Sequence, residues 1–251
     1  MIDSHVHADQ LKDPLSAIER ALQSGVTGAL WVSVDPASWH ANQVQHQRVA
    51  QAIPSWTTWM AYGIHPEIGV PQTEDLFDHW SCQLQKGYLH AVGEIGLPYY
   101  HAVSAHEWAV RVDLTLRQLR LAAKWELPVV IHAVHDATWP MLDLLQRTPS
   151  LPSIVFHWLK APPSAIQEII RRGYYVGITP EVLWRNRDQT LLSLIPMDQI
   201  LWETDAPWPH DLAHKRPSEP ADLLEMANSP ICMPGPDKVR ENFLRFIRAF
   251  G

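Results

Sequence analysis

Two histidines one residue apart, His5 and His7, stand near the start of the chain in the stretch Asp3-Ser4-His5-Val6-His7. Alternate side chains of a β-strand share a face, so both imidazoles would point the same way while Val6 packs on the other side. Two imidazoles so placed could hold one metal ion. The pair alone is equally compatible with a surface position, so the metal interpretation depends on further ligand-type side chains along the chain.

Further His, Glu and Asp side chains fall where predicted strands end. These are His65, Glu94, His132, His157 and Asp205. In a barrel of parallel strands, these ends face the active-site mouth. Taken singly, His157 could be a core histidine, Asp205 a helix N-cap and Glu94 a buried ion-pair partner. Their joint placement indicates a metal site.

Four imidazoles and two carboxylates are more ligands than one tetrahedral zinc ion needs, so the residues predict two divalent ions that share a carboxylate, Glu94. We expect one ion on His5, His7 and Asp205 and the other on His132 and His157. Such a pair lowers the pKa of a bridging water and produces hydroxide near neutral pH. Mg, Mn and Zn stay open, because His and carboxylate ligands accept several divalent ions.

The remaining roles follow from position. Asp205 could also orient the water as a general base, which makes it catalytic together with the bridging carboxylate. His65 is expected outside the ligand set, either behind the ligands or in contact with a substrate oxyanion, since Pro66 follows it and the ligand count is already met. Lys160, Trp208 and His135 are the expected substrate contacts. The sequence has no GxSxG elbow, Cys-His signature or glycine-rich phosphate loop.

These side chains would be positioned by eight alternations of a short β-rich run with a longer amphipathic run. The strands are expected at 1–7, 27–34, 57–65, 90–96, 128–134, 153–159, 174–179 and 200–204. The helices are expected at 14–25, 38–53, 73–85, 104–126, 137–147, 163–172, 191–195, 221–227 and 237–250. This order predicts an α/β fold, a (β/α)₈ TIM barrel formed by one domain over 1–251. The alternative, an open doubly wound sheet, usually has a glycine-rich turn after its first strand, and none is present.

Composition narrows the class of partner. With 251 residues, 46% hydrophobic and 19% charged, the chain is typical of a globular protein. Its net charge of −7 argues against extended duplex binding, which normally needs a basic surface, but leaves strand ends and small phosphate esters open. Cys82 and Cys232 are expected to be ordinary thiols in a reducing cytoplasm. We expect no membrane span and no cleavable signal peptide.

At its motifs the chain resembles the TatD family of metal-dependent deoxyribonucleases, within the amidohydrolase superfamily. The resemblance spans almost the whole chain and rests on motifs in a fixed order. These are Asp3-Ser-His-Val-His7, Gly63-Ile-His-Pro66, Gly93-Glu-Ile-Gly-Leu97, Pro128-Val-Val-Ile-His132, His157 and Glu203-Thr-Asp-Ala-Pro207. Arg216-Pro-Ser-Glu-Pro220 is a divergent form of the family's Arg-Asn-Glu-Pro segment. The resemblance implies the same barrel, the same six metal ligands, and hydrolysis of phosphodiesters, often as an exonuclease acting from a DNA 3′ end.

The departures from the family pattern fall in the expected pocket. Pro98 stands where the family usually has Asp, Val134 where an arginine is common, and Trp158-Leu-Lys-Ala161 where Cys-Phe-Ser-Gly is usual. They indicate a divergent member. Some TatD-like proteins belong to bacterial anti-phage defence systems, which suggests partner proteins of a defence operon. Two other functions stay open: hydrolysis of a small ester, lactone or amide by the same metals, and a binding subunit that has lost catalysis.

Overall fold

Eight parallel strands follow one another around a single sheet in the computed structural model, which describes residues 1–68, 73–210 and 216–247. The strands are β1 Ile2–Val6, β2 Gly28–Ser33, β3 Thr57–Tyr62, β4 Ala91–Gly96, β5 Val129–His132, β6 Ile154–Phe156, β7 Tyr175–Ile178 and β8 Ile200–Trp202. An isolated parallel bridge joins Val6 to Ala206, and the His7 N–H donates to the Ala206 carbonyl at 2.8 Å. The sheet is therefore a nearly closed barrel, as predicted.

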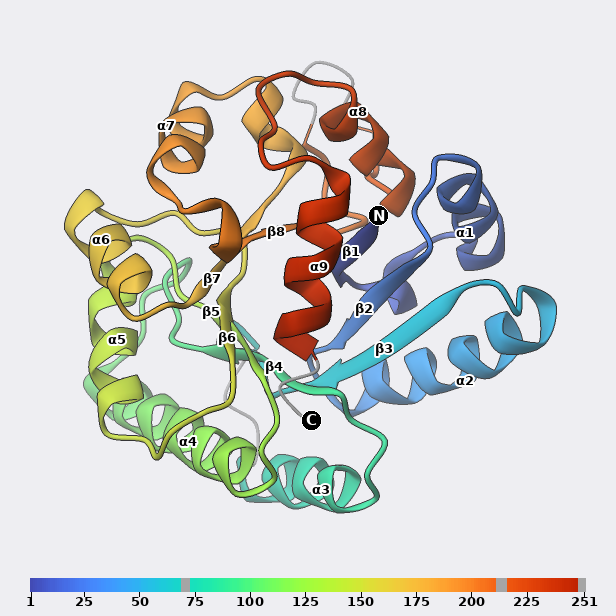
Figure 1. Ribbon diagram of the computed structural model, residues 1–251. Helices are drawn as coiled ribbons and strands as arrows, with labels where there is room; N and C mark the ends of the chain where they lie inside the picture. Colours follow the sequence, from blue (N-terminus) through green and yellow to red (C-terminus); the bar gives the residue numbers. More distant parts are fainter. Residues whose placement is uncertain (69–72, 211–215, 248–251) are drawn as a thin grey trace.

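Helices surround the strands (Figure 1). They are α1 Pro14–Gln23, α2 Pro36–Ala52, α3 Thr73–Gln85, α4 Ala105–Lys124, α5 Thr138–Gln146, α6 Pro163–Arg171, α7 Asn186–Leu194, α8 Leu223–Ala227 and α9 Pro236–Ile247. Helix α4 begins with a capping box, since the Ser104 side chain accepts from the Glu107 N–H and the Glu107 side chain accepts from the Ser104 N–H. Gly25 follows the end of α1 with φ +81°, the left-handed conformation that glycine adopts readily. Among the described helices, none is both long and apolar enough to cross a bilayer.

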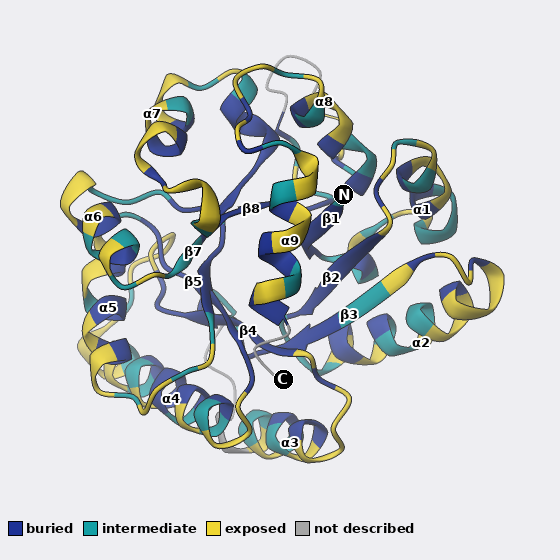
Figure 2. Ribbon diagram, in the orientation of Figure 1, coloured by how far each residue is buried: buried dark blue, intermediate teal, exposed yellow. Residues whose placement is uncertain are grey.

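The barrel interior is filled at its N-terminal end by α9. One apolar cluster gathers inward residues of the strands, such as Ala61, Val130 and Leu201, together with Phe243 and Phe246 of α9. Figure 1 shows α9 lying across this end of the barrel, and Figure 2 shows the strands almost wholly buried. Because α9 closes one end, a substrate can enter only from the other, where the strands have their C-terminal ends.

Several predicted boundaries were wrong. The helix predicted at 191–195 begins five residues earlier, at Asn186, because the polar run from Arg185 to Asp188 hides its first turn. The third strand ends at Tyr62 rather than at His65, and β6 ends at Phe156. The end of the predicted last helix, 248–250, lies outside the described residues.

Candidate metal centre

Simple alternation along a strand places half of the predicted ligands inside the barrel mouth. In β5, Val130 faces the barrel interior, and His132, two residues later, therefore faces the same way. Leu201 of β8 also faces the interior, and Asp205 lies four residues after it, on the same face. His157 follows Val155 of β6 in the same way. Three of the six predicted ligands therefore continue the inward face of their own strand.

The other two strands reach the site through irregular register. Ile2 packs in the barrel interior, yet His5, three residues on, lies in the metal cluster, and the β1–β2 register shifts between Asp3 and Val6. A second shift between Val92 and Ile95 in β4 lies at Glu94. Such irregularities re-aim a side chain toward a site.

Gly93 permits the irregularity in β4. Its φ is +155°, and a Cβ there would lie 2.6 Å from Val130 Cβ. Only glycine fits both the backbone conformation and the space. The position of the Glu94 carboxylate therefore depends on Gly93, since only glycine allows the backbone conformation that precedes it.

The Glu94 carboxylate lies at the centre of the cluster, 2% exposed. Its Oε2 is 3.4 Å from His5 Nε2 and 3.9 Å from His7 Nε2. Its Oε1 is 2.5 Å from His132 Nδ1 and 3.8 Å from His157 Nε2. One oxygen thus faces the first pair of histidines and the other faces the second pair, so the carboxylate lies within reach of both groups.

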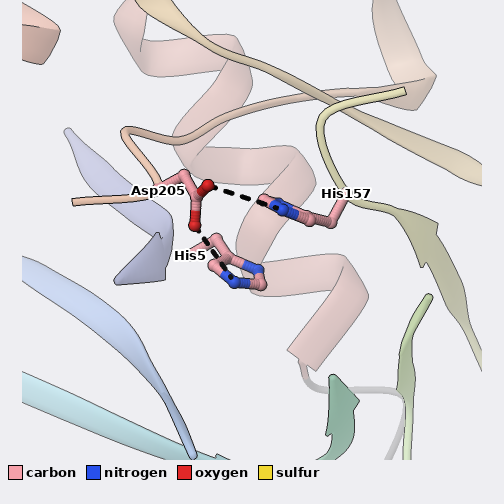
Figure 3. A group of neighbouring side chains, drawn as sticks. All are labelled: His5, His157 and Asp205. Atoms are coloured by element: carbon pink, nitrogen blue, oxygen red, sulfur yellow. Dashed lines mark ion pairs between the residues drawn. The ribbon is translucent and has the colours of Figure 1, made fainter. Parts of the chain in front are cut away.

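Asp205 lies across from this carboxylate and contacts both histidine groups. Its Oδ1 is 3.3 Å from His7 Nε2 and 3.6 Å from His5 Nε2, while Oδ2 is 3.9 Å from His157 Nε2. Figure 3 shows Asp205 directed at His5 and His157, whose rings stack at 3.7 Å. Within the described residues, three groups could each hold a cation, with ligand atoms inside 4.8 Å: His5, His157 and Asp205; His5, His7 and Glu94; His65, Glu94 and His132.

His65 lies closer to this centre than its predicted auxiliary role requires. Its Nε2 is 3.3 Å from Glu94 Oε1, and its ring is 4.7 Å from that of His132. The structure therefore groups His65 with Glu94 and His132, and places His157 nearer to His5 and Asp205.

Charge in the cluster favours a bound cation. Burial raises the pKa of Glu94, but the imidazoles of His65, His157 and His132 outweigh it and hold that pKa well below its ordinary value. Burial also raises the pKa of Asp205, yet His157 and His7 bring it to about 2. Two ionised carboxylates in a buried site require compensating positive charge.

In the protein alone, imidazoles contribute to that charge, since, against the effect of burial, the carboxylates raise the pKa of both His157 and His7. Burial lowers the pKa of His157, but the neighbouring carboxylates, Glu203 first, raise it to about 10. His132 Nε2 is buried without a hydrogen-bond partner in the described structure, which is costly for a polar atom. Nitrogen and carboxylate donors with this charge balance fit divalent cations well.

Two buried carboxylates behind the ligands were not singled out from the sequence. Glu203 Oε1 accepts from the Trp158 N–H at 2.6 Å and lies 2.9 Å from His157 Nδ1, so it orients that ring. Asp3 accepts from the Thr204 hydroxyl at 2.6 Å and the Thr204 N–H at 3.0 Å. Burial, the largest effect, raises the pKa of Asp3 to about 8. Glu203 shares the parity of Asp205, so alternation could have identified it.

A cavity of about 690 Å³ opens above the cluster. Its wall includes two of the predicted substrate contacts, Lys160 and Trp208, and also Trp158, which was expected in the pocket. Pro98 and Val134, expected there too, are not among the lining residues, whereas Glu67 and Tyr100 line the cavity and were not predicted. Glu67 Oε1 accepts from the Tyr99 and Tyr100 N–H groups at 2.6 and 3.0 Å and so holds the loop after β4 against the cavity.

The third predicted contact, His135, is not among the residues that line this cavity. Its ring packs 4.8 Å from Tyr99, and its backbone N–H donates to the Lys160 carbonyl. It therefore lies behind the wall, next to the loops that carry Lys160 and Tyr99.

Comparison with known proteins identifies the family. The family model described as TatD related DNase matches residues 2–233. The chain belongs to the TatD-related DNase family. It is therefore a metal-dependent hydrolase, as the resemblance implied.

TatD relatives cover most of the chain. The 3′-5′ ssDNA/RNA exonuclease TatD of Citrobacter koseri is 33% identical over 225 residues, 86% of this chain and 83% of the relative. A metal-dependent hydrolase of Haemophilus influenzae is 31% identical over 217 residues, 84% of this chain and 82% of the relative. The crystal structure of a TatD homologue from Escherichia coli superposes with a TM-score of 0.81 at 21% identity, covering 98% and 97% of the two chains. The last comparison supports the TIM-barrel fold.

Proposed function

We propose that this TatD-family hydrolase removes nucleotides from the 3′ end of single-stranded DNA with two divalent cations. The observation that carries the proposal is the position of Glu94, whose two carboxylate oxygens face different histidine groups at 2.5 and 3.4 Å. The direction of cleavage is taken from relatives named as 3′-5′ ssDNA/RNA exonucleases.

The ligand residues divide between two cations. We assign His5, His7 and Asp205 to one cation and His132 and His157 to the other, with Glu94 between them. The ring positions argue against the place of His157 in this division, because its ring lies 3.7 Å from that of His5 and 6.5 Å from that of His132. Divalent ions bound there would activate water and neutralise charge on the phosphoryl oxygens. The imidazole and carboxylate ligands accept Mg, Mn or Zn and do not select among them.

The chain's own groups supply the remaining steps. Asp205, ionised and at the floor of the cavity, accepts a proton from the attacking water. Glu203 keeps the His157 ring in one orientation through the contact at Nδ1, 2.9 Å away. His65, which also lines the cavity, is placed to donate to a phosphoryl oxygen. Lys160 and Trp208 contact the substrate from the wall, and His135 supports them from behind.

The size of the cavity favours strand ends. Its volume of about 690 Å³ lies within the range of small-ligand pockets, roughly 300–1,000 Å³. The site is thus suited to one or two nucleotides entering from an end, and a duplex would have to be opened first. This agrees with the net charge of −7, which does not favour duplex tracking.

A nuclease assay tests the proposal. Metal-loaded protein is incubated with a 5′-labelled single-stranded oligonucleotide whose 3′ end is free or blocked by phosphorothioate linkages, and with the matching RNA. We expect a ladder of products shortened from the free 3′ end only. Asp205→Asn is the inactive control. Intact oligonucleotide beside hydrolysis of generic esters, lactones or amides would establish the small-substrate alternative, and undiminished biological activity of Asp205→Asn would establish a non-catalytic binding subunit.

The biological setting is a separate proposal. We propose a single-domain cytoplasmic protein that acts with partner proteins of an anti-phage defence operon. The test is a plaque assay, which compares phage plaque counts on cells that carry the operon with the wild-type chain and with the Asp205→Asn chain. Equal plaque counts would refute the defence role and leave the nuclease proposal standing.

A further inference from the structure

Two arginines lie on the loop between β7 and α7, outside the set of residues that line the cavity. Arg185 is the N-cap residue of α7, and Arg187 lies in its first turn. The partial positive charge at a helix N-terminus makes cations unfavourable there, so these arginines do not stabilise the helix. Helix α7 is also without a side-chain cap at this end. The positive charge therefore calls for another explanation.

One buried carboxylate fastens this loop to the cavity wall. Glu181, 2% exposed, lies 2.7 Å from Arg185 Nη2 and 3.1 Å from Arg187 Nη2. Its Oε2 also accepts from Trp158 Nε1 at 3.2 Å. Trp158 lines the cavity. Both arginines are thereby fixed relative to the metal centre.

Lys160 stands between the loop and the metal centre. Its Nζ lies 3.7 Å above the Trp158 ring and has no hydrogen bond or ion pair with any described residue. Burial lowers the pKa of the Lys160 ammonium; Glu181 and Asp188 raise it, and Arg187 and Arg185 lower it further. A partly buried ammonium without a direct ion pair is costly, and an anionic ligand in contact with it would relieve that cost.

The charge of this group is positive at the surface. Among the described residues, Lys160, Arg185 and Arg187 are offset by two carboxylates, Glu181 and Asp188, which are 2% and 5% exposed. The Arg187 side chain, in contrast, is 44% exposed, and its Nη1 has no partner in the described parts of the chain. In a chain of net charge −7, this is a local surplus of one positive charge beside the cavity.

We propose that Arg185, Arg187 and the N-terminus of α7 bind a second phosphate of an oligonucleotide substrate, adjacent to the one hydrolysed, with Lys160 between the two. In TIM barrels, loops after strands seven and eight together with a helix N-terminus frequently form phosphate sites. Neither arginine lines the cavity, but Glu181 contacts both of them and also Trp158, which does. The inference rests on the proposed nuclease function and adds where the strand beyond the scissile bond is held.

Two measurements separate this inference from the nuclease proposal. Binding of fluorescein-labelled hexathymidylate is followed by anisotropy over a range of salt concentrations, and hydrolysis of bis(p-nitrophenyl) phosphate, which has one phosphate, reports on the metal centre. The variant is Arg187→Gln. The matched control is Arg171→Gln on α6, an arginine paired with Glu168 at 2.7 Å near the opposite end of the barrel.

We expect Arg187→Gln to bind the hexanucleotide about tenfold more weakly, because a charge-assisted phosphate contact is lost. The slope of log K against log salt should become shallower by about one unit. Hydrolysis of the single diester should be unchanged. Arg187→Lys keeps the charge and should retain the slope, and Arg185→Gln should repeat the loss if the Arg187→Gln chain does not fold.

Hexanucleotide affinity and salt slope equal to those of wild type and Arg171→Gln would overturn the second phosphate site. Equal losses on the oligonucleotide and on the single diester would also overturn it, because they would place the effect at the metal centre. Failure of the wild-type chain to cleave any phosphodiester would refute the nuclease proposal, whereas the binding comparison would still decide the phosphate site.

Discussion

Replacing Gly177 by alanine should disturb the metal centre from behind. A Cβ at Gly177 would lie 2.3 Å from the carboxylate carbon and both oxygens of Glu203. Ordinary contacts begin near 3.4 Å, so the carboxylate must retreat by about 1.1 Å. Glu203 is 1% exposed and has no free space for that movement.

The cost follows from the bonds that Glu203 makes. Retreat weakens the contacts to His157 Nδ1 at 2.9 Å and to the Trp158 N–H at 2.6 Å. A hydrogen bond to a charged group contributes about 1.5–3 kcal/mol, so partial loss of two gives about 2–4 kcal/mol. For a chain of this size, that lowers Tm by about 4–16 °C. Loss of the partner that orients His157 should also weaken metal binding roughly 10–100-fold.

The measurements are thermal unfolding followed by circular dichroism and metal binding followed by calorimetry. Gly235→Ala is the control, because no atom lies within 4 Å of its added Cβ. It should stay within about 0.5 kcal/mol of wild type. If Gly177→Ala behaved like this control in both stability and metal affinity, Glu203 would not be the orienting partner of His157.

Three further predictions concern the cluster and its cavity. Glu94→Gln removes the shared charge while keeping the shape, and we expect kcat to fall by at least about 100-fold with the fold intact by circular dichroism; near-normal turnover would exclude Glu94 as the bridge. Chelation by EDTA should lower the free energy of unfolding by about 2.7 kcal/mol relative to protein with metal at about 100 times Kd, measured by urea titration, whereas coincident curves would show that no cation binds the native state. Lys160→Met should reduce kcat/KM on oligonucleotides about tenfold at unchanged metal affinity, and a change in metal affinity instead would place Lys160 at the metal centre.

The barrel was predictable from the sequence because the residues that begin and end several of its helices are local signals. Asp13, Asp35 and Ser104 accept hydrogen bonds at the starts of α1, α2 and α4, and glycine follows the ends of α1 and α6. The helix α7 was placed too late because its first turn carries arginines, which are unfavourable there. That mismatch between local preference and structure is typical of functional sites, and it coincides with the loop that we assign to a phosphate.

The pocket was predictable only in part, since its wall is formed by loops. Lys160 and Trp208 lie on the loops that follow β6 and β8, and both line the cavity as predicted. Glu67 and Tyr100 meet through a side-chain to backbone bond across 33 positions of sequence, which no spacing rule indicates. His135 also follows a strand end, but Tyr99 packs against its ring and it does not line the cavity.

The metal ligands show why chemistry was a better guide than periodicity at the two irregular strands. Strict alternation from the inward Ile2 would have turned His5 toward the helices, and alternation from Ala91 would have done the same to Glu94. The register shifts in β1 and β4 reverse that parity between the barrel core and the mouth. Both shifts lie at the residues that we assign to the first cation and to the bridge. Regular strands would pack the core equally well, so the irregularities are explained by the need to bring imidazoles and a carboxylate onto one centre.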